Sequence, residues 1–139
     1  MEYNTGGLIA SQLTDGPGAS EYFLGGLVPY SVQALNAYGV DGAVLDANGP
    51  DSLETSRAMA RAVRERFGAD VGLAVTGTTG MPGTTRQNPG SLYLAVDLGG
   101  EVTAEEGSIF GSTAPHLKVR AALATLDLLR KRLQAAVPA

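Results

Sequence analysis

Apolar residues recur at helical spacing in several parts of the chain. The clearest case is 51–67, where one face is apolar, Asp51 and Glu54 are spaced as in a capping box, and Gly68 follows as a stop. A second long helix is predicted over 115–136 from its stripe of alanine and leucine. Shorter helices are expected over 8–13, 31–38 and 41–47.

Three further segments have the apolar pattern of strands. Residues 71–76 form a nearly continuous apolar run, which is typical of a buried central strand. Segments 92–97 and 102–110 flank a Gly-Gly pair and are predicted to form a hairpin. A short strand is also expected over 27–30, at a sheet edge because Pro29 has no N–H to donate.

This order of elements predicts an α/β fold. Helices and strands alternate early in the chain, and the late strands are consecutive. We therefore expect a mixed sheet with helices packed on it in a three-layer arrangement. With 139 residues, of which 44% are hydrophobic and 17% charged, the chain is expected to form a single domain over 1–139.

Composition excludes several classes of function. The net charge of −4 argues against a nucleic-acid-binding surface, since the single basic run, Arg130 to Arg132, lies near the end of a predicted helix. With no cysteine and one histidine, disulfides, thiolate nucleophiles and Cys/His metal sites are excluded, and neither a metal nor another cofactor is expected. No apolar run approaches a membrane span and the start is polar, so no membrane association and a cytoplasmic location are expected.

Four glycine-bearing segments occur in an order that resembles a known family. They are Glu2–Gly7, Pro17–Ser31, Val75–Gly80 and Asn88–Leu92. These segments resemble the motifs E-S-C-T-G-G, P-G-x-S with F-x-G-G-x-V-x-Y-S, V-T-G-I-A-G and K-P-V-G-T-V of the CinA C-terminal domain, or nicotinamide-nucleotide amidase, family. The resemblance implies a CinA C-terminal-domain-like fold and hydrolysis of the amide of nicotinamide mononucleotide.

The resemblance also implies that this chain has lost the residues of that chemistry. Tyr3 stands at the family's serine nucleophile and Leu35 at its lysine base, while the family's tyrosine is retained as Tyr30. The two lysines of the chain both lie in the predicted terminal helix. The leading hypothesis is therefore a divergent member that keeps a small-molecule pocket, for ligand binding or for a repurposed reaction.

Two candidate catalytic residues remain. Tyr30 is the retained tyrosine, and Ser31 is the serine beside it, which is either a substitute nucleophile or the N-cap of the following helix. Candidate ligand-binding residues share a place in glycine-rich loops next to a helix or after a buried strand, where anions and ligands bind or where the chain simply turns. These candidates are Glu2, Thr5, Gly6, Gly7, Thr76, Gly77 and Gly80.

Two alternative functions stay open. One keeps the amidohydrolase activity, with Ser31 or Thr5 as nucleophile and Lys118 as base. The other is a non-enzymatic interaction subunit. The chain starts one residue before the first motif, so we expect an N-terminally shortened sheet with an open edge, which favours a homo-oligomer. The expected ligand is a nucleotide or an aromatic amide.

Overall fold

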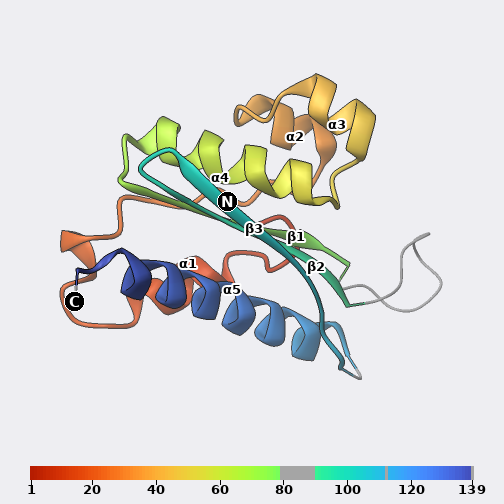
Figure 1. Ribbon diagram of the computed structural model, residues 1–139. Helices are drawn as coiled ribbons and strands as arrows, with labels where there is room; N and C mark the ends of the chain where they lie inside the picture. Colours follow the sequence, from red (N-terminus) through yellow and green to blue (C-terminus); the bar gives the residue numbers. More distant parts are fainter. Residues whose placement is uncertain (79–89, 112, 139) are drawn as a thin grey trace.

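The structure is a computed structural model that describes residues 1–78, 90–111 and 113–138. Its elements are α1 (Leu8–Thr14), the 3₁₀ helix η1 (Ala19–Glu21), α2 (Val32–Ala37), α3 (Gly42–Asn48), α4 (Leu53–Phe67), β1 (Val71–Gly77), β2 (Ser91–Leu98), β3 (Glu101–Ser108) and α5 (Ala114–Ala136). Figure 1 shows α4 on one face of the sheet, with α2 and α3 beyond it, and α1 and α5 on the other face. The α/β prediction is confirmed.

The sheet has the order β1-β2-β3, and both pairs of strands are antiparallel. Its mixed character comes from a parallel bridge between Glu2 and Val75. Here the N–H of Val75 donates to the Met1 carbonyl at 3.2 Å, and the N–H of Tyr3 donates to the Val75 carbonyl at 3.0 Å. Residues 1–3 are thus aligned along the outer edge of β1.

The prediction of a strand over 27–30 is wrong. The segment has no strand pairing in the structure, although the Leu27 carbonyl accepts a hydrogen bond from the N–H of Glu2 at 2.9 Å. Pro29 removes the N–H that would have continued such a pairing. The segment therefore passes beside residues 1–3 without becoming part of the sheet.

The two faces of the sheet bury separate hydrophobic cores. Ala74 and Ala95 face α4, where Met59 and Leu35 are fully buried. Val75 points to the opposite face and packs in the core formed with α1 and α5. This separation follows from the alternation of side chains along a strand.

Helix α4 begins one residue later than the capping box predicts. Ser52 is its N-cap, and the Ser52 side chain accepts a hydrogen bond from the N–H of Thr55 at 3.1 Å. The prediction of Asp51 as the cap is wrong, because that carboxylate accepts a hydrogen bond from Thr76 instead. Gly68, with φ of 60°, ends the helix as predicted.

Close packing of α4 on β1 depends on Gly72. An ideal Cβ at this position would overlap the carbonyl oxygen of Ala60 and lie 2.8 Å from Cβ of Arg64. We expect Gly72→Ala to lower the free energy of unfolding by about 1–3 kcal/mol, because α4 must move away from the sheet. Gly107→Ala is the matched control, since a Cβ there meets no atom within 4 Å. Urea denaturation of both variants tests this, and equal midpoints would contradict it.

None of the helices in the described part of the chain combines the length and apolar character that a bilayer-spanning helix requires.

Candidate functional site

A row of polar and aromatic side chains crosses one end of the sheet on the face covered by α4. Thr76 lies directly opposite Tyr93 on β2, and Tyr93 lies directly opposite Glu106 on β3. Directly paired residues share a face, so these side chains are neighbours. Tyr3 extends the row beyond β1, since Glu2 is paired with Val75 and the next residues are aligned in the same way. We call Tyr3, Thr76, Tyr93 and Glu106 the tyrosine row.

Tyr30 stacks on the Tyr3 end of this row. The two ring centroids are 6.4 Å apart, and the ring planes are inclined by 30°. Tyr30 is 77% exposed, whereas Tyr3 is only partly exposed and packs against the α4-side core. The pair therefore presents the ring of Tyr30 to solvent, and the ring of Tyr3 packs against its inner side.

Asp51 brings a negative charge to the tyrosine row. Thr76 Oγ1 lies 2.6 Å from Asp51 Oδ1 and 2.9 Å from the Pro50 carbonyl, so the single hydrogen of this fully buried hydroxyl is shared between these two acceptors. Burial, followed by the charge of Asp51 and the neighbouring Tyr30, raises the pKa of Tyr3. Burial, followed by Glu106 and Asp51, raises the pKa of Tyr93. Both phenols are thus neutral hydrogen-bond donors at neutral pH rather than nucleophiles.

The contribution of Asp51 to the raised pKa of Tyr3 can be tested by substitution. Asp51→Asn removes one of the negative charges that disfavour the phenolate, so Tyr3 should deprotonate at a lower pH in this variant. In the parent protein the stability that this phenol contributes is present below its ordinary pKa of about 10 and is lost as the pH rises further. Absorbance at the phenolate band between neutral and alkaline pH, with Tyr3→Phe to assign the transition, is the measurement. An unchanged midpoint would contradict the role of Asp51.

Ser31 and Leu35, which the sequence analysis singled out, have structural roles in α2. Ser31 is the N-cap of α2, and its Oγ accepts a hydrogen bond from the N–H of Ala34 at 3.1 Å. Leu35 lies one turn further along α2 and is fully buried in the α4-side core. The N-cap interpretation of Ser31 is confirmed, while a catalytic role for Ser31 or Tyr30 stays a prediction.

The polar groups of the loop at Thr5–Gly7 and of the start of α1 are occupied by a side chain of the protein itself, the carboxylate of Glu2. Glu2 Oε2 accepts from Thr5 Oγ1 at 2.5 Å and from the N–H of Ile9 at 3.0 Å, and Glu2 Oε1 accepts from the N–H of Ala10 at 2.8 Å. This buried carboxylate therefore takes the place of a ligand at the start of α1. Its partner Thr5 is also buried.

Glycines of this region shape its turns and contacts. Gly6 and Gly7 have φ of 67° and 94°, the left-handed conformation that reverses the chain before α1. Lys118 Nζ lies 3.7 Å from the position of an ideal Cβ on Gly6, so this lysine covers the loop from α5. Gly77 ends β1 where its backbone meets Ser91 of β2. Gly80 lies outside the described residues.

Sequence reasoning missed Asp51, Tyr93 and Glu106 as members of the site. The register of the 92–97 and 102–110 hairpin places Tyr93 beside Glu106, and a count outward from the Gly-Gly turn would have shown this pairing. The approach of Asp51 to Thr76 depends on how α4 packs, which no local pattern shows. Among the described residues, no group of His, Asp and Glu side chains is arranged to hold a metal ion.

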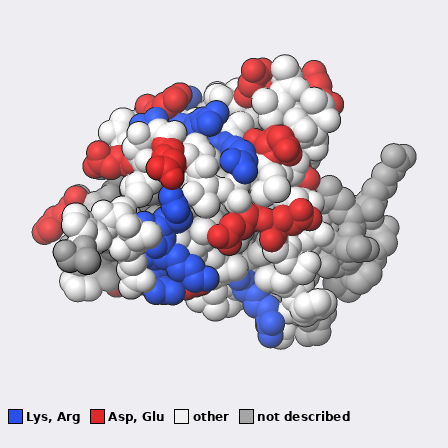
Figure 2. All heavy atoms as spheres, viewed as in Figure 1, with Lys and Arg blue, Asp and Glu red and all other residues white. Residues whose placement is uncertain are grey.

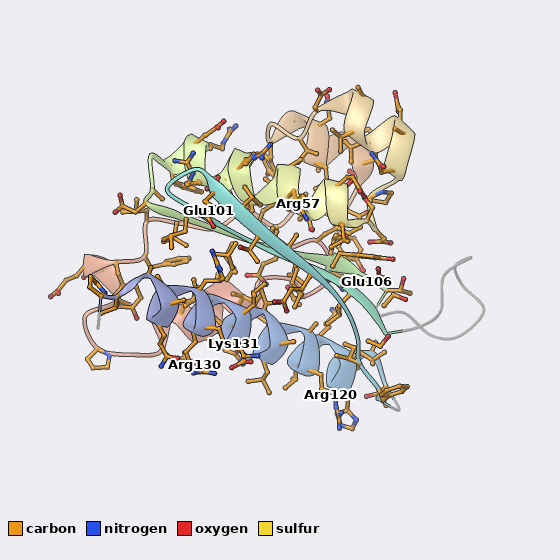
Figure 3. The ribbon with its side chains drawn as sticks, in the orientation of Figure 1. Arg57, Glu101, Glu106, Arg120, Arg130 and Lys131 are labelled. Atoms are coloured by element: carbon orange, nitrogen blue, oxygen red, sulfur yellow. The ribbon has the colours of Figure 1, made fainter. Side chains whose placement is uncertain are left out.

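Several charged side chains at the end of α5 form ion pairs. Figure 2 shows basic and acidic side chains interspersed over the visible face, with basic ones gathered over the lower helix. Figure 3 places Arg130 and Lys131 on α5, where both pair with Asp127 at 2.7 Å, and these contacts lower the pKa of Asp127. Arg132 reaches Glu101 of β3 at 3.1 Å. The basic run is therefore partly neutralised within the protein.

Comparison with known proteins assigns the family. Residues 1–133 match the family model of the CinA C-terminal domain. The chain belongs to the CinA C-terminal domain family. A CinA-like protein of Myxococcus xanthus is 42% identical over 134 residues, covering 95% of this chain and 32% of that protein. A CinA-like protein of Frankia casuarinae is 39% identical, covering 93% of this chain and 30% of that protein. The chain thus spans about a third of the length of these relatives.

A solved structure of a CinA-family protein has the same fold. The competence/damage inducible protein CihA of Agrobacterium tumefaciens is 29% identical and superposes with a TM-score of 0.86. The match covers 94% of this chain and 81% of that chain. The expected CinA C-terminal-domain-like fold is therefore confirmed.

Proposed function

We propose that this CinA-family domain binds a small aromatic ligand at the tyrosine row and does not perform amide hydrolysis by a serine–lysine pair. The observation that carries this proposal is the stacking of Tyr3 on Tyr30. Tyr3 stands where the family resemblance places the serine nucleophile, and its ring supports the exposed Tyr30 ring from below. A stacked, solvent-facing ring is suited to hold a planar ligand.

The chemistry around the stacked pair supports binding over hydrolysis. Leu35, at the position of the family's lysine, is fully buried in the core and has no group that accepts a proton. The phenol of Tyr3 has a raised pKa and is therefore a poor nucleophile at neutral pH. Ser31 already accepts a helix N–H as a cap. These features leave no evident nucleophile–base pair among the positions that the resemblance assigns to catalysis.

The charges around the row favour a cationic aromatic ring. Asp51 lies close enough to both Tyr3 and Tyr93 to influence their pKa values, and Glu106 does the same for Tyr93. Carboxylates beside aromatic faces attract a ring that carries positive charge, and the face of Tyr30 adds a cation–π contribution. Nicotinamide mononucleotide has such a ring, which makes it the probe of choice.

The proposal predicts stabilisation by this nucleotide without turnover. At a concentration about 100 times Kd, a ligand that binds only the native state stabilises it by about 2.7 kcal/mol, which raises Tm. The purified protein should show this rise while releasing no ammonia. Ammonia release that Ser31→Ala or Lys118→Ala abolishes would overturn the proposal and favour an amidohydrolase with substitute residues.

A pair of tyrosine variants locates the binding site. Tyr30→Ala should remove the rise in Tm, because the exposed ring is the stacking surface. We expect this variant to fold, since the side chain of Tyr30 is 77% exposed. Tyr22→Ala is the matched control, since Tyr22 is 57% exposed but lies beside α1, where its hydroxyl donates to the Leu13 carbonyl. Loss of the rise in Tyr22→Ala with retention in Tyr30→Ala would contradict binding at the tyrosine row.

A further inference from the structure

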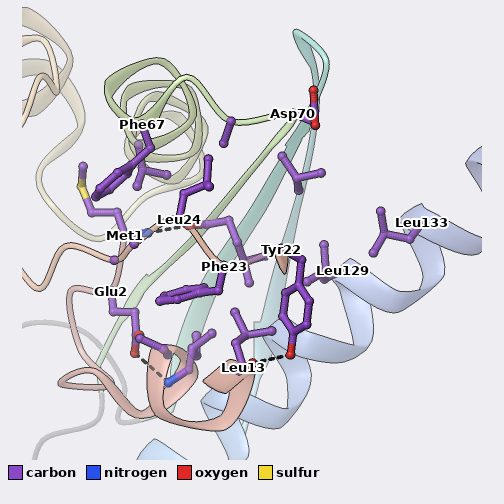
Figure 4. A pocket seen from close by; sticks show the side chains of 18 of the residues that line it. Met1, Glu2, Leu13, Tyr22, Phe23, Leu24, Phe67, Asp70, Leu129 and Leu133 are labelled. Carbon is purple, nitrogen blue, oxygen red and sulfur yellow. Dashed lines mark hydrogen bonds between the residues drawn. The ribbon is translucent and has the colours of Figure 1, made fainter. Parts of the chain in front are cut away.

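The sheet has two edges, one at β1 and one at β3. Residues 1–3 are aligned along the β1 edge, and Phe23 and Leu24 line an apolar pocket beside it (Figure 4). Strand β3, by contrast, is hydrogen-bonded on one side only, to β2. Within the described part of the chain, no backbone group bonds to its other side. The β3 edge is therefore a free template for strand pairing.

The register of the sheet shows which backbone groups of β3 face outward. The N–H of Thr78 donates to the Ser91 carbonyl at 2.9 Å, so Ser91 and alternate residues after it bond to β1. The residues between them bond to β3, where their partners are the odd-numbered residues. In agreement, the N–H of Ile109 donates to the Gly90 carbonyl at 2.8 Å. The N–H and C=O groups of the even-numbered residues, from Val102 to Ser108, consequently point away from the sheet.

Exposed glutamates restrict how this edge can pair with a copy of itself. Figure 3 places Glu101 and Glu106 along β3, and both are exposed, as is Glu105. Two antiparallel copies bring their outward groups together only when the twofold axis passes through a residue. An axis at Thr103 sets Glu101 opposite the partner's Glu105, and an axis at Glu105 or Glu106 sets that glutamate opposite its own copy. Like charges directly opposite each other destabilise a strand pair.

We infer that two copies of this chain associate through β3, in the antiparallel register centred on Ala104, and so continue the sheet across a dimer. This register pairs residues 101–107, and no glutamate lies directly opposite another. Val102 exchanges two backbone hydrogen bonds with the partner's Glu106, and the two copies of Ala104 do the same with each other. Registers centred nearer either end of β3 would pair few residues. This association goes beyond ligand binding at Tyr30 and does not depend on it.

The side chains that meet in this register fit on both faces of the sheet. On the α5 face, the hydroxyl of Thr103 can donate to the carboxylate of the partner's Glu105. On the α4 face, Val102 and Ala104 are only partly buried against the core. The partner strand would cover the exposed part of these two side chains.

The charges beside the strand pair also match. Arg57 is exposed on α4, which packs over β3, and Figure 3 places it on the same side of the molecule as Glu106. Neither of the two side chains forms an ion pair with another described residue. Pairing of the strands would bring the α4 helices of both copies to the same face of one sheet. The arginines of both helices would then add positive charge near the two Glu106 carboxylates.

Cysteine cross-linking tests the register directly, because the chain has no cysteine of its own. In the proposed register the Cα atoms of the two copies of residue 104 lie about 5.5 Å apart, within the range of a disulfide. Residues 103 and 105 are offset along the strand from their own copies, beyond the limit of about 7 Å. Under mild oxidation, Ala104→Cys should form a covalent dimer at least tenfold faster than Thr103→Cys or Glu105→Cys. Faster cross-linking at 103 or 105, or none at all three positions, would overturn the inference.

Removal of one outward N–H tests the hydrogen bonding between the copies. Ala104→Pro removes an N–H that faces away from β2, so each copy keeps its own ladder. Its dimer dissociation constant, measured by sedimentation equilibrium, should be at least tenfold higher than that of the parent. Ala104→Ser keeps the N–H and should dimerise as the parent does. A parent that stays monomeric at millimolar concentration, or a folded proline variant that dimerises equally well, would contradict the inference, and the cross-linking rates decide if the proline variant does not fold.

Discussion

Replacing Leu35 with lysine is expected to lower the free energy of unfolding at pH 7 by about 4 kcal/mol, without creating amidase activity. Leu35 is fully buried, and the core around it contains Met59, Val40 and Ala74. A lysine there must either lose its proton or carry an unpaired charge into an apolar region. The double variant Tyr3→Ser, Leu35→Lys should therefore remain inactive toward nicotinamide mononucleotide.

The pH dependence of this effect separates charge from packing. The introduced lysine has its ordinary pKa of about 10.4 in the unfolded chain and a lower pKa in the core, so the unfolded state binds more protons at pH 7. The destabilisation should consequently shrink as the pH rises toward 10. Leu35→Met is the control, because methionine has a similar length but no charge and should cost less than about 1.5 kcal/mol. A lysine variant as stable as the methionine variant at pH 7 would show that position 35 is accessible to water and would weaken the binding proposal.

The predictable part of the fold is the part that local patterns determine. The apolar stripe and Gly68 located α4 to within two residues at its start, and the continuous apolar run located β1. The hairpin of β2 and β3 follows from alternation and the Gly-Gly turn. The segment 27–30 shows the limit of such reasoning, since its apolar residues pack beside residues 1–3 without strand pairing, and only the tertiary arrangement distinguishes these outcomes.

The sequence predicted only those residues of the candidate site that lie within recognisable sequence motifs. Residues Glu2 to Gly7 and Tyr30 were found from motifs, and the structure brings Tyr3 and Tyr30 into contact. Their chemical setting was not predictable, because it depends on Asp51 and Tyr93, which reach the row through helix packing and strand register. The same is true of Glu2, whose role depends on the amides of a helix that begins six residues later.

Replacing Glu2 with alanine is expected to lower the free energy of unfolding by about 3 kcal/mol. The carboxylate accepts hydrogen bonds from Thr5, Ile9 and Ala10, all at or near the start of α1. Each buried donor left without a partner costs about 1–3 kcal/mol, and bonds to a charged acceptor are among the stronger ones. Some of this loss should be recovered by water entering the loop, since Ala10 is only partly buried.

Two further variants distinguish the effect of the hydrogen bonds that Glu2 accepts from the effect of removing any carboxylate. Glu2→Gln keeps the length and one acceptor oxygen, so it should lose less stability than Glu2→Ala, whereas Glu21→Ala removes an exposed carboxylate and should stay within about 0.5 kcal/mol of the parent. Hydrogen exchange distinguishes a local effect from a global one. In Glu2→Ala the amides of Ile9 and Ala10 should exchange faster than the lower global stability accounts for, whereas the amides of α4 should exchange only as much faster as global unfolding requires. If these two amides stayed protected, the start of α1 would be held by its packing on α5 rather than by Glu2, and the loop at Gly6 and Gly7 would again be available to an external anion.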